Sequence, residues 1–189
     1  MTTGKTKILI VDDEEVLRQM VGRVFKYMNI DHNSASDGLV ALERLKEGFY
    51  DIIIADIRMP NMDGMELLKI VKKKYPLSDI LIMTAHTSKY SYIDVIESGA
   101  LDYIMKPFSV EELKAKIERM LRERNTINEL SRKTAELEQA YTELLALKDD
   151  DGKKDREINY EREFLLVEIE RLKEDNKHLE LKPLKPGTR

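Results

Sequence analysis

Carboxylate, hydroxyl and amino side chains follow several short apolar runs in this sequence. In chain order they are Asp12 and Asp13, Asp56, Thr84 and Lys106. Carboxylates that converge repel one another and need a cation, and oxygen ligands of this kind suit Mg²⁺. A carboxylate beside a divalent cation, a hydroxyl and an ammonium group could stabilise a phosphoryl group that arrives on an aspartate, because the charge developing on its oxygens needs such partners.

The apolar runs are the elements that must bring these side chains together. They are short and β-branched, which predicts strands buried on both faces at 7–11, 51–55, 79–83 and 101–104, with a weaker candidate at 31–35. Apolar residues recur at helical spacing between them. Five β-then-α units in about 120 residues predict an α/β fold with a doubly wound, five-stranded parallel sheet. Sites in such sheets lie at the carboxyl ends of the strands, where these polar residues are found.

Each polar position also has a purely structural interpretation. Asp12 or Asp13 could cap the following helix, and Lys106-Pro107 is a common loop dipeptide. Asp63 is expected to cap a later helix in the same way. Suitable residues at four separate strand ends of one small domain are difficult to explain by chance, so the sequence favours a functional site.

Four segments resemble the receiver domain of two-component response regulators. They are ILIVDDEE (8–15), DIIIADIRMPNMDGMELL (51–68), ILIMTAH (80–86) and GALDYIMKPFSVEEL (99–113). The resemblance implies a flavodoxin-like receiver domain over residues 1–122. It also implies that Asp56 is the phosphoacceptor, that a histidine kinase is the phosphodonor, and that the protein is a signalling protein rather than an enzyme acting on an external substrate.

The same resemblance implies a magnesium site. Asp13 and Asp56 would ligate Mg²⁺ together with the backbone carbonyl of Arg58, and Asp12 would act largely through water. Mg²⁺ keeps several waters and takes few protein ligands, which fits this small set. Every position of the family's active set holds the expected residue type, so a receiver that cannot be phosphorylated is not expected.

Further roles follow only from the resemblance. Thr84 and Lys106 would contact the phosphoryl oxygens, and Tyr103 would change rotamer as Thr84 moves. Arg58 and His86 occupy two positions thought to tune the lifetime of the aspartyl phosphate. A long cation and an imidazole could screen the phosphate from water or position a water, and the sequence does not decide between these effects.

The last helix of the receiver has no stop signal. Ser109 and Glu112 predict its start as a capping box, and no proline and a single glycine occur from Ser109 to Lys182. Apolar residues recur there in heptads, which predicts a coiled-coil extension over 123–181, followed by a disordered tail at 182–189. Its core positions are Ile127, Leu130, Leu137, Tyr141, Leu144, Ile158, Leu165, Ile169, Leu172, Asn176 and Leu179.

A polar gap at 148–155 interrupts the heptads and allows two structures. The segment could be a turn that folds the two stretches into an antiparallel hairpin, with Gly152 after a helix end. It could also be a solvated part of one long helix, which the unchanged heptad phase mildly favours. A long helix predicts self-association, most simply a parallel homodimer. The alternative is that the apolar stripe binds a helix of another protein.

Composition limits the remaining classes. The chain has 32 basic and 36 acidic residues and a net charge of −4, which argues against direct nucleic-acid binding. It has no cysteine, no signal peptide and no apolar run that would insert into a membrane, so a cytoplasmic protein is expected. Two alternatives stay open: a constitutive coiled-coil scaffold with a docking receiver, and a receiver–linker fragment of a larger transcription activator. A haloacid-dehalogenase-type phosphotransferase is disfavoured, because that class needs a D-x-D pattern at the nucleophile. Here Asp56 is followed by Ile57-Arg58, and the paired acids lie at the end of the first strand.

Overall fold

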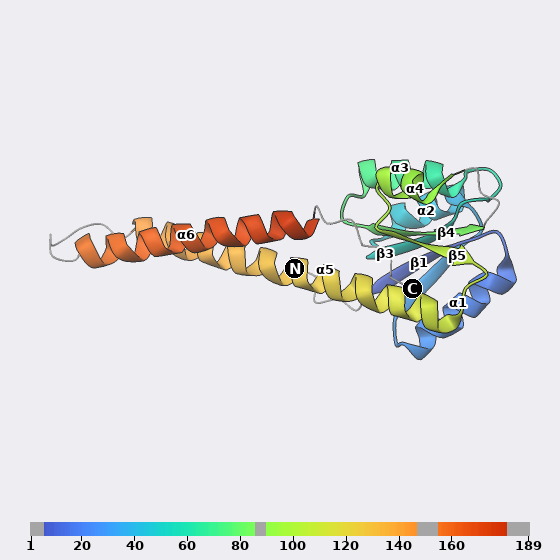
Figure 1. Cartoon of the computed structure of the whole chain (residues 1–189), viewed down its shortest axis with the longest axis horizontal. Coiled ribbons are helices and arrows are strands. Elements are labelled where there is room, and N and C mark those ends of the chain that lie inside the picture. The colour runs from blue at the N-terminus through green and yellow to red at the C-terminus, as the bar shows by residue number, and fades with distance from the viewer. Residues whose placement is uncertain (1–5, 86–89, 147–154, 181–189) are drawn as a thin grey trace. The chain divides into compact units, whose positions relative to one another are not determined.

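The computed structural model describes residues 6–85, 90–146 and 155–180, apart from the side chains of 145, 146, 155–158, 179 and 180 (Figure 1). The chain divides into two compact units, with the boundary between Ile117 and Glu118. Within the described residues, no helix combines the length and the apolar character that crossing a membrane requires.

The first unit is built on a five-stranded sheet in the order β2-β1-β3-β4-β5. All neighbouring strands pair in parallel. The strands are β1 (Lys7–Val11), β2 (Asp31–Ala35), β3 (Ile52–Asp56), β4 (Asp79–Ala85) and β5 (Asp102–Lys106). The predicted doubly wound parallel sheet is therefore confirmed. Strands β4 and β5 extend two residues further than the apolar runs indicated, so Thr84 and Lys106 belong to the strands themselves.

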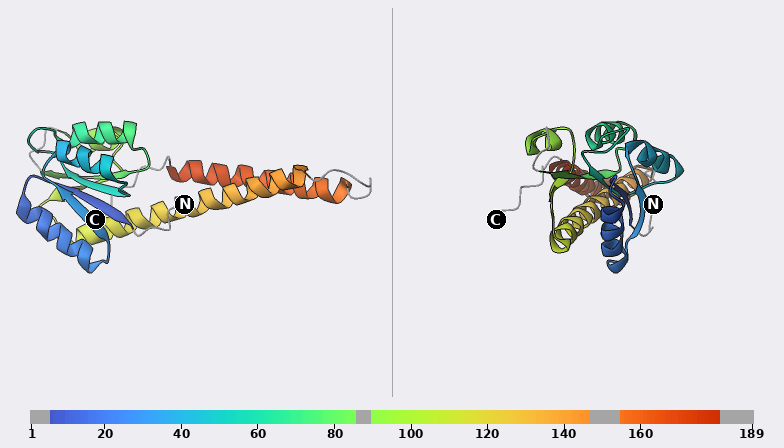
Figure 2. Two further views of the ribbon diagram at one scale, coloured as in Figure 1. Left: turned by 180° about the vertical axis from the view of Figure 1, so that it is seen from behind. Right: turned by 90° about the vertical axis from the view of Figure 1, so that its right-hand side faces the viewer.

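Helices cover both faces of this sheet. They are α1 (Glu15–Tyr27), α2 (Gly38–Glu47), α3 (Gly64–Lys74), α4 (Tyr92–Glu97) and α5 (Val110–Ala146). Helix α1 and the first turns of α5 lie on one face, and α2, α3 and α4 lie on the other (Figures 1 and 2). Strands β1, β3 and β4 are central and almost fully buried, which explains why their sequences are continuously apolar.

Local capping fixes where two of the helices begin. Asp63 and Glu66 form a reciprocal capping box at the start of α3, as the sequence predicts for Asp63. The Ser109 hydroxyl accepts a hydrogen bond of 3.0 Å from the Glu112 amide at the start of α5. Each cap satisfies helix amides that have no partner within the helix, so each fixes the strand-to-helix connection that precedes it.

Asp37 joins the start of α2 to the loop that follows Asp56. Its carboxylate accepts hydrogen bonds from the amides of Leu39 and Val40, at 2.9 and 3.0 Å, and from the side-chain amide of Asn61 at 3.0 Å. The bond from Val40 is the largest of the effects that hold the pKa of Asp37 below its ordinary value of 3.8. Asp37 therefore acts both as a helix cap and as a tether for the loop beside the strand ends.

We expect Asp37→Ala to lower the free energy of unfolding by about 1–2 kcal/mol, since it removes a helix cap and the bond from Asn61. Asp37→Asn keeps a capping oxygen and should cost far less at neutral pH. Because folding lowers the pKa of Asp37, its stabilisation is present above pH 3.8 and is lost as the pH falls through the folded-state pKa. Urea denaturation across pH checks this, and equal stability of the alanine variant and the wild type would contradict it.

The second unit contains the rest of α5 and helix α6 (Asp155–Glu180). Contacts between the helices pair early residues of one with late residues of the other. Lys173 forms an ion pair with Glu138 at 2.6 Å, and the Asn176 side-chain amide donates a hydrogen bond to the Ser131 hydroxyl at 3.1 Å. The Arg162 guanidinium donates to the Leu144 carbonyl at 2.8 Å. The helices are therefore antiparallel and lie side by side (Figures 1 and 2).

This arrangement corrects the interpretation of one continuous helix. Unchanged heptad phase is compatible with a hairpin, because each stretch keeps its own apolar stripe after the chain reverses. Residues 148–154 of the predicted polar gap at 148–155 lie outside the described residues, and Asp155 is the first residue of α6. Glu138 on α5 and Lys173 on α6 form an ion pair within the same chain. Whether the chain forms a homodimer stays a prediction.

The predicted coiled-coil positions lie on the facing sides of the hairpin where their side chains are described. Ile169 is buried, and Thr134, beside the predicted core, is buried as well. The partly buried positions are Ile127, Leu130, Leu137, Tyr141, Leu144, Leu165, Leu172 and Asn176. The side chains of Ile158 and Leu179 are not among those described. A narrow apolar seam with polar residues in it is typical of a coiled-coil hairpin.

Because the chain has no cysteine, paired thiols can test the hairpin. The variant Ser131→Cys with Asn176→Cys should oxidise to a monomer with an internal disulfide, since the native side chains are 3.1 Å apart. Non-reducing gel electrophoresis checks this. The single variant Ser131→Cys is the control and should stay monomeric. A double variant that forms no internal disulfide under oxidising conditions would contradict the hairpin.

Candidate functional site

A pocket of about 690 Å³ opens at the carboxyl ends of the strands. It brings together side chains from the ends of β1, β3 and β5 and the first turns of α1. Its lining residues are Asp13, Glu14, Leu17, Met20, Asp56, Arg58, Ala85, Lys106, Pro107 and Phe108. Polar groups at the strand ends therefore share this pocket with apolar side chains from α1 and from the segment after β5.

Lys106 links the acidic residues at this pocket. Its ammonium group lies 2.7 Å from the Asp12 carboxylate, 3.3 Å from Asp56 and 3.9 Å from Glu14. The Asp12 side chain is fully buried, and 11% of the Asp56 side chain is exposed. Two buried carboxylates are thus held near one cation, which offsets part of their mutual repulsion.

The electrostatics of the pocket follow from this burial. Burial raises the pKa of the Asp56 carboxyl; Lys106 opposes the change and the neighbouring Asp12 charge adds to it. Burial alone would lower the pKa of Lys106, but its hydrogen bond to Asp12 and the charge of Asp56 outweigh this and raise it. Lys106 is therefore held in its charged form, and the Asp56 carboxylate lies where additional positive charge would be favourable.

The loop between β1 and α1 is fixed by bonds that the sequence did not indicate. The Arg18 guanidinium donates to the backbone carbonyls of Asp12 and Asp13, at 2.6 and 3.0 Å. Asp12 also accepts a bond of 2.8 Å from the Glu14 amide. Glu14 itself occupies the cap position of α1 and makes no capping bond through its side chain, so neither Asp12 nor Asp13 is the cap residue. No spacing signal points to Arg18, because its partners are backbone atoms.

A glycine is required beside Asp56. A Cβ on Gly64 would overlap the backbone carbonyl oxygen of Asp56. The Gly64 amide donates to the Ile57 carbonyl at 3.0 Å, and the Ile57 amide donates to the Met83 carbonyl at 3.0 Å. The start of α3 is therefore packed directly against the backbone of the strand end, and this close packing holds Asp56 in place.

Thr84 and Tyr103 line a different cavity, of about 160 Å³, which also includes Tyr90 and Tyr92. The Thr84 hydroxyl bonds the Ala85 carbonyl at 3.3 Å. The rings of Tyr92 and Tyr103 pack with their centroids 4.7 Å apart. Thr84 and Tyr103 therefore line one cavity together, but Thr84 is not among the residues that line the Asp56 pocket.

The remaining predicted residues are distributed as follows. Asp13, Asp56, Arg58 and Lys106 line one pocket, and Asp12 joins them through Lys106. His86 lies outside the described residues. The peptide bond after Lys106, to Pro107, is cis.

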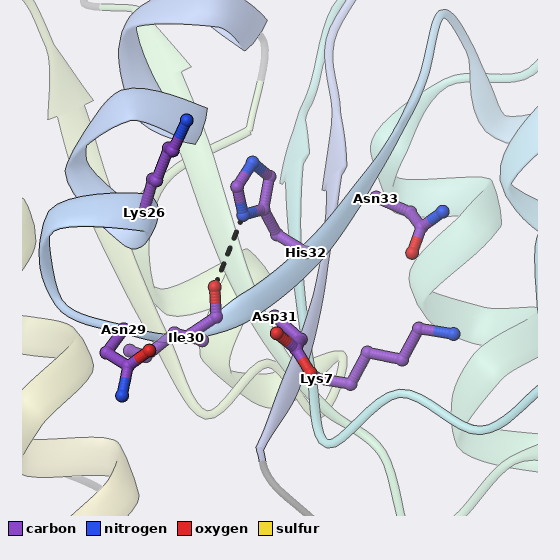
Figure 3. Close-up of a pocket in the computed structure, with 7 residues that line it drawn as sticks. All are labelled: Lys7, Lys26, Asn29, Ile30, Asp31, His32 and Asn33. Carbon is purple, nitrogen blue, oxygen red and sulfur yellow. Dashed lines mark hydrogen bonds between the residues drawn. The ribbon is translucent and has the colours of Figure 1, made fainter.

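A second hollow, at the opposite ends of β1 and β2, does not form a comparable site. It is lined by two lysines, four other polar residues and Ile30, and the polar side chains do not point toward a common centre (Figure 3). The His32 ring turns toward α1 (Figure 3). It packs edge-on against Phe25 of that helix, with ring centroids 6.0 Å apart. Lys7 lies over the ring of Tyr50 instead. Convergence of charged groups therefore distinguishes the carboxyl ends of the strands.

The donor set at Asp56 fits a hard divalent cation by its chemistry. Carboxylates of Asp13 and Asp56 line one pocket with Arg58, whose backbone carbonyl could add a third oxygen. Among the described residues, no three His, Asp or Glu side chains already form a closed metal cluster. The carboxylates are instead arranged around the Lys106 ammonium. A cation entering here would find oxygen ligands and an open pocket, which suits an ion that keeps several waters.

Comparison with known proteins identifies the class of this fold and site. The model of the response regulator receiver domain matches residues 8–118, more than half of the chain. The chain therefore belongs to the receiver family of two-component response regulators, as the sequence motifs indicate. Receiver domains generally bind Mg²⁺ at their acidic pocket.

Individual relatives agree with this assignment. The chain is 38% identical over 117 residues to the response regulator ArlR of Staphylococcus saprophyticus, and 34% identical over 114 residues to the DNA-binding transcriptional regulator NtrC of Escherichia coli. These matches cover 62% and 60% of this chain, but only 53% and 24% of the relatives. The shared part is thus the receiver alone.

The solved structures that resemble this chain match the same part of it. The receiver domain of the Francisella response regulator 1452 is 34% identical, with a TM-score of 0.58, and the match covers 62% of this chain and 97% of that one. The chemotaxis protein CheY4 of Vibrio cholerae is 33% identical, also with a TM-score of 0.58, over 62% of this chain and 99% of that one. Both matches are to almost complete receiver domains.

We expect Lys106→Met to lower the free energy of unfolding by about 2 kcal/mol at neutral pH, since two buried carboxylates lose their shared cation. Mg²⁺ should restore part of this loss, because an ion that binds only the folded state stabilises it. Thermal denaturation with Mg²⁺ or with a chelator checks both effects. Lys46→Met, at an exposed surface ion pair, is the control. A Lys106 variant as stable as the wild type and indifferent to Mg²⁺ would contradict this electrostatic account.

Proposed function

We propose that this protein is a two-component response regulator that accepts a phosphoryl group on Asp56 from a histidine kinase. The observation that carries the proposal is the position of Asp56, at the end of a central strand and 3.3 Å from the Lys106 ammonium. Its carboxylate lines an open pocket, so a phosphodonor can reach it. The receiver family, to which the chain belongs, uses this position of the motif for phosphorylation.

Transfer of a phosphoryl group needs a nucleophile and positively charged groups around the phosphoryl oxygens. An Asp56 carboxylate oxygen would attack the phosphorus of a phosphohistidine; an oxygen–phosphorus bond forms as the phosphorus–nitrogen bond to the imidazole breaks. Lys106 is placed to bind a phosphoryl oxygen, and the Thr84 hydroxyl could donate to another after it turns from the Ala85 carbonyl. Mg²⁺, held by Asp13, Asp56 and the Arg58 carbonyl with Asp12 acting through water, would supply further charge neutralisation.

A line of contacts supports a route from this site to α5. Tyr103 shares a cavity with Thr84, and its ring lies 5.4 Å from the Lys116 ammonium. Lys116, on α5, also pairs with Asp102 at 2.9 Å. A move of Thr84 toward the phosphoryl group would free space for the Tyr103 ring, and a turn of that ring would weaken its contact with Lys116. Phosphorylation would then favour one state of α5 by the difference in stability between the two states.

The proposed output is the antiparallel hairpin that α5 and α6 form. In this proposal it dimerises or binds a helical partner, in the cytoplasm, without direct contact to DNA. The relatives NtrC and AtoC favour a second candidate. NtrC is named as a DNA-binding transcriptional regulator, and the matches to the two span about a quarter of their length, at 24% and 26%. This chain would then be the receiver and linker of a longer activator.

Phosphorylation can be tested with acetyl phosphate as donor. The wild type should gain a phosphoryl group only when Mg²⁺ is present, and Asp56→Asn should gain none, since an amide cannot act as the nucleophile. Intact-protein mass spectrometry measures the adduct. Asp63→Asn, at an exposed helix cap that asparagine also provides, should be labelled like the wild type. Full labelling of the Asp56 variant would place the phosphoacceptor elsewhere and overturn the proposal.

A further inference from the structure

Helix α6 carries two apolar faces. One consists of Leu165, Ile169 and Leu172, which lie on the side that contacts α5 and are buried or partly buried. The other consists of Tyr160, Phe164 and Val167, which are 77%, 67% and 65% exposed. We call the second set the outer face of α6. The hairpin uses only the first face.

The outer face is a continuous stripe along the helix. Its three residues follow the spacing i, i+4 and i+7, which places them on one side of an α-helix. At about 100° per residue, this side lies roughly opposite the side that contacts α5. Single exposed apolar residues are normal, but two aromatic rings and a valine in one stripe form an exposed apolar patch, the kind of surface that marks interaction sites.

Glutamates border the outer face on both sides. Glu161 and Glu168 lie along one edge, and Glu163 and Glu170 lie along the other. The basic residue that continues the stripe, Arg171, is 3.6 Å from Glu168. An apolar centre with acidic edges is complementary to an apolar centre with basic edges.

The same charges disfavour a second copy of this chain as the occupant. An antiparallel pair of α6 helices would place Glu161 near Glu168 of the other copy, and Glu163 near Glu170. A parallel pair would place Glu163 near Glu168 of the other copy. Like charges at these flanking positions repel in either orientation. Self-association through this face is therefore opposed, whichever way the helices run.

We propose that the outer face of α6 binds an amphipathic helix of another protein, whose apolar stripe is flanked by lysine or arginine. The added helix would pack on the side of α6 opposite α5, with Phe164 as the central apolar contact and the glutamates paired to its cations. This inference rests on the proposed function in one respect, which is that it describes the partner through which the signal would leave the hairpin. Binding itself needs no phosphoryl group, so its failure is distinct from failure of Asp56 phosphorylation.

Two designed helical peptides test the proposal on the full chain. Both carry the same heptad apolar stripe; one has lysine and arginine at the flanking positions, and the other has glutamate. Fluorescence anisotropy should show binding of the basic peptide and none of the acidic one. Phe164→Glu and Val167→Glu should each weaken binding at least about tenfold, because each removes an apolar side chain from the centre of the contact. An added glutamate does not repel a basic peptide, so weaker binding would report the lost apolar contact. Leu77→Glu, at an exposed leucine in the first unit, should bind like the wild type.

A charge reversal gives a second measurement that does not depend on the apolar residues. Glu163→Lys with Glu170→Lys should weaken binding of the basic peptide and permit binding of the acidic one. Circular dichroism confirms that each variant keeps its helix content. Absence of binding by the basic peptide, or equal binding of both peptides, would overturn the proposal. So would concentration-dependent dimerisation that Phe164→Glu abolishes, because a second copy would then occupy the face.

Discussion

The ion pairs of Lys106 are the interaction on which the receiver site depends. Three carboxylates, of Asp12, Glu14 and Asp56, lie within 4 Å of one ammonium group. A parallel sheet brings its strand ends to one edge and so concentrates these charges, and the burial of Asp12 and Asp56 makes the repulsion between those two costly. Lys106, from the last strand, offsets this repulsion with its positive charge, and the Asp56 carboxylate still lines an open pocket. The same lysine therefore stabilises the acidic strand ends and lies beside the carboxylate that we propose as the phosphoacceptor.

Close backbone packing supports that charge arrangement. Gly64 lets α3 start directly against the carbonyl of Asp56, and Asp37 ties the following loop to α2. Arg18 holds the carbonyls of the acidic loop after β1. These contacts hold the backbone on either side of the acidic strand ends.

Most of the fold and of the candidate site was predictable, because periodicity and strand-end chemistry are local in sequence. Apolar runs identify buried strands, and Asp12, Asp56 and Lys106 follow from the ends of those runs. Arg18 was not predictable, since it bonds backbone atoms that any residue supplies. The choice between a hairpin and one long helix was not predictable, because the unchanged heptad phase on the two sides of the polar gap is compatible with both structures. Only contacts such as Glu138 with Lys173, far apart in sequence, decide the direction of α6.

Amide hydrogen exchange of the full chain, with and without beryllium fluoride and Mg²⁺, tests the central claim most directly, since the fluoride complex stands in for the phosphoryl group on Asp56. Signalling through the helices predicts altered exchange at the strand ends, in β5 and α5, and onward into α6. Change confined to the loops around Asp56, with α5 and α6 unaffected, would contradict this account and would make the hairpin a constitutive platform.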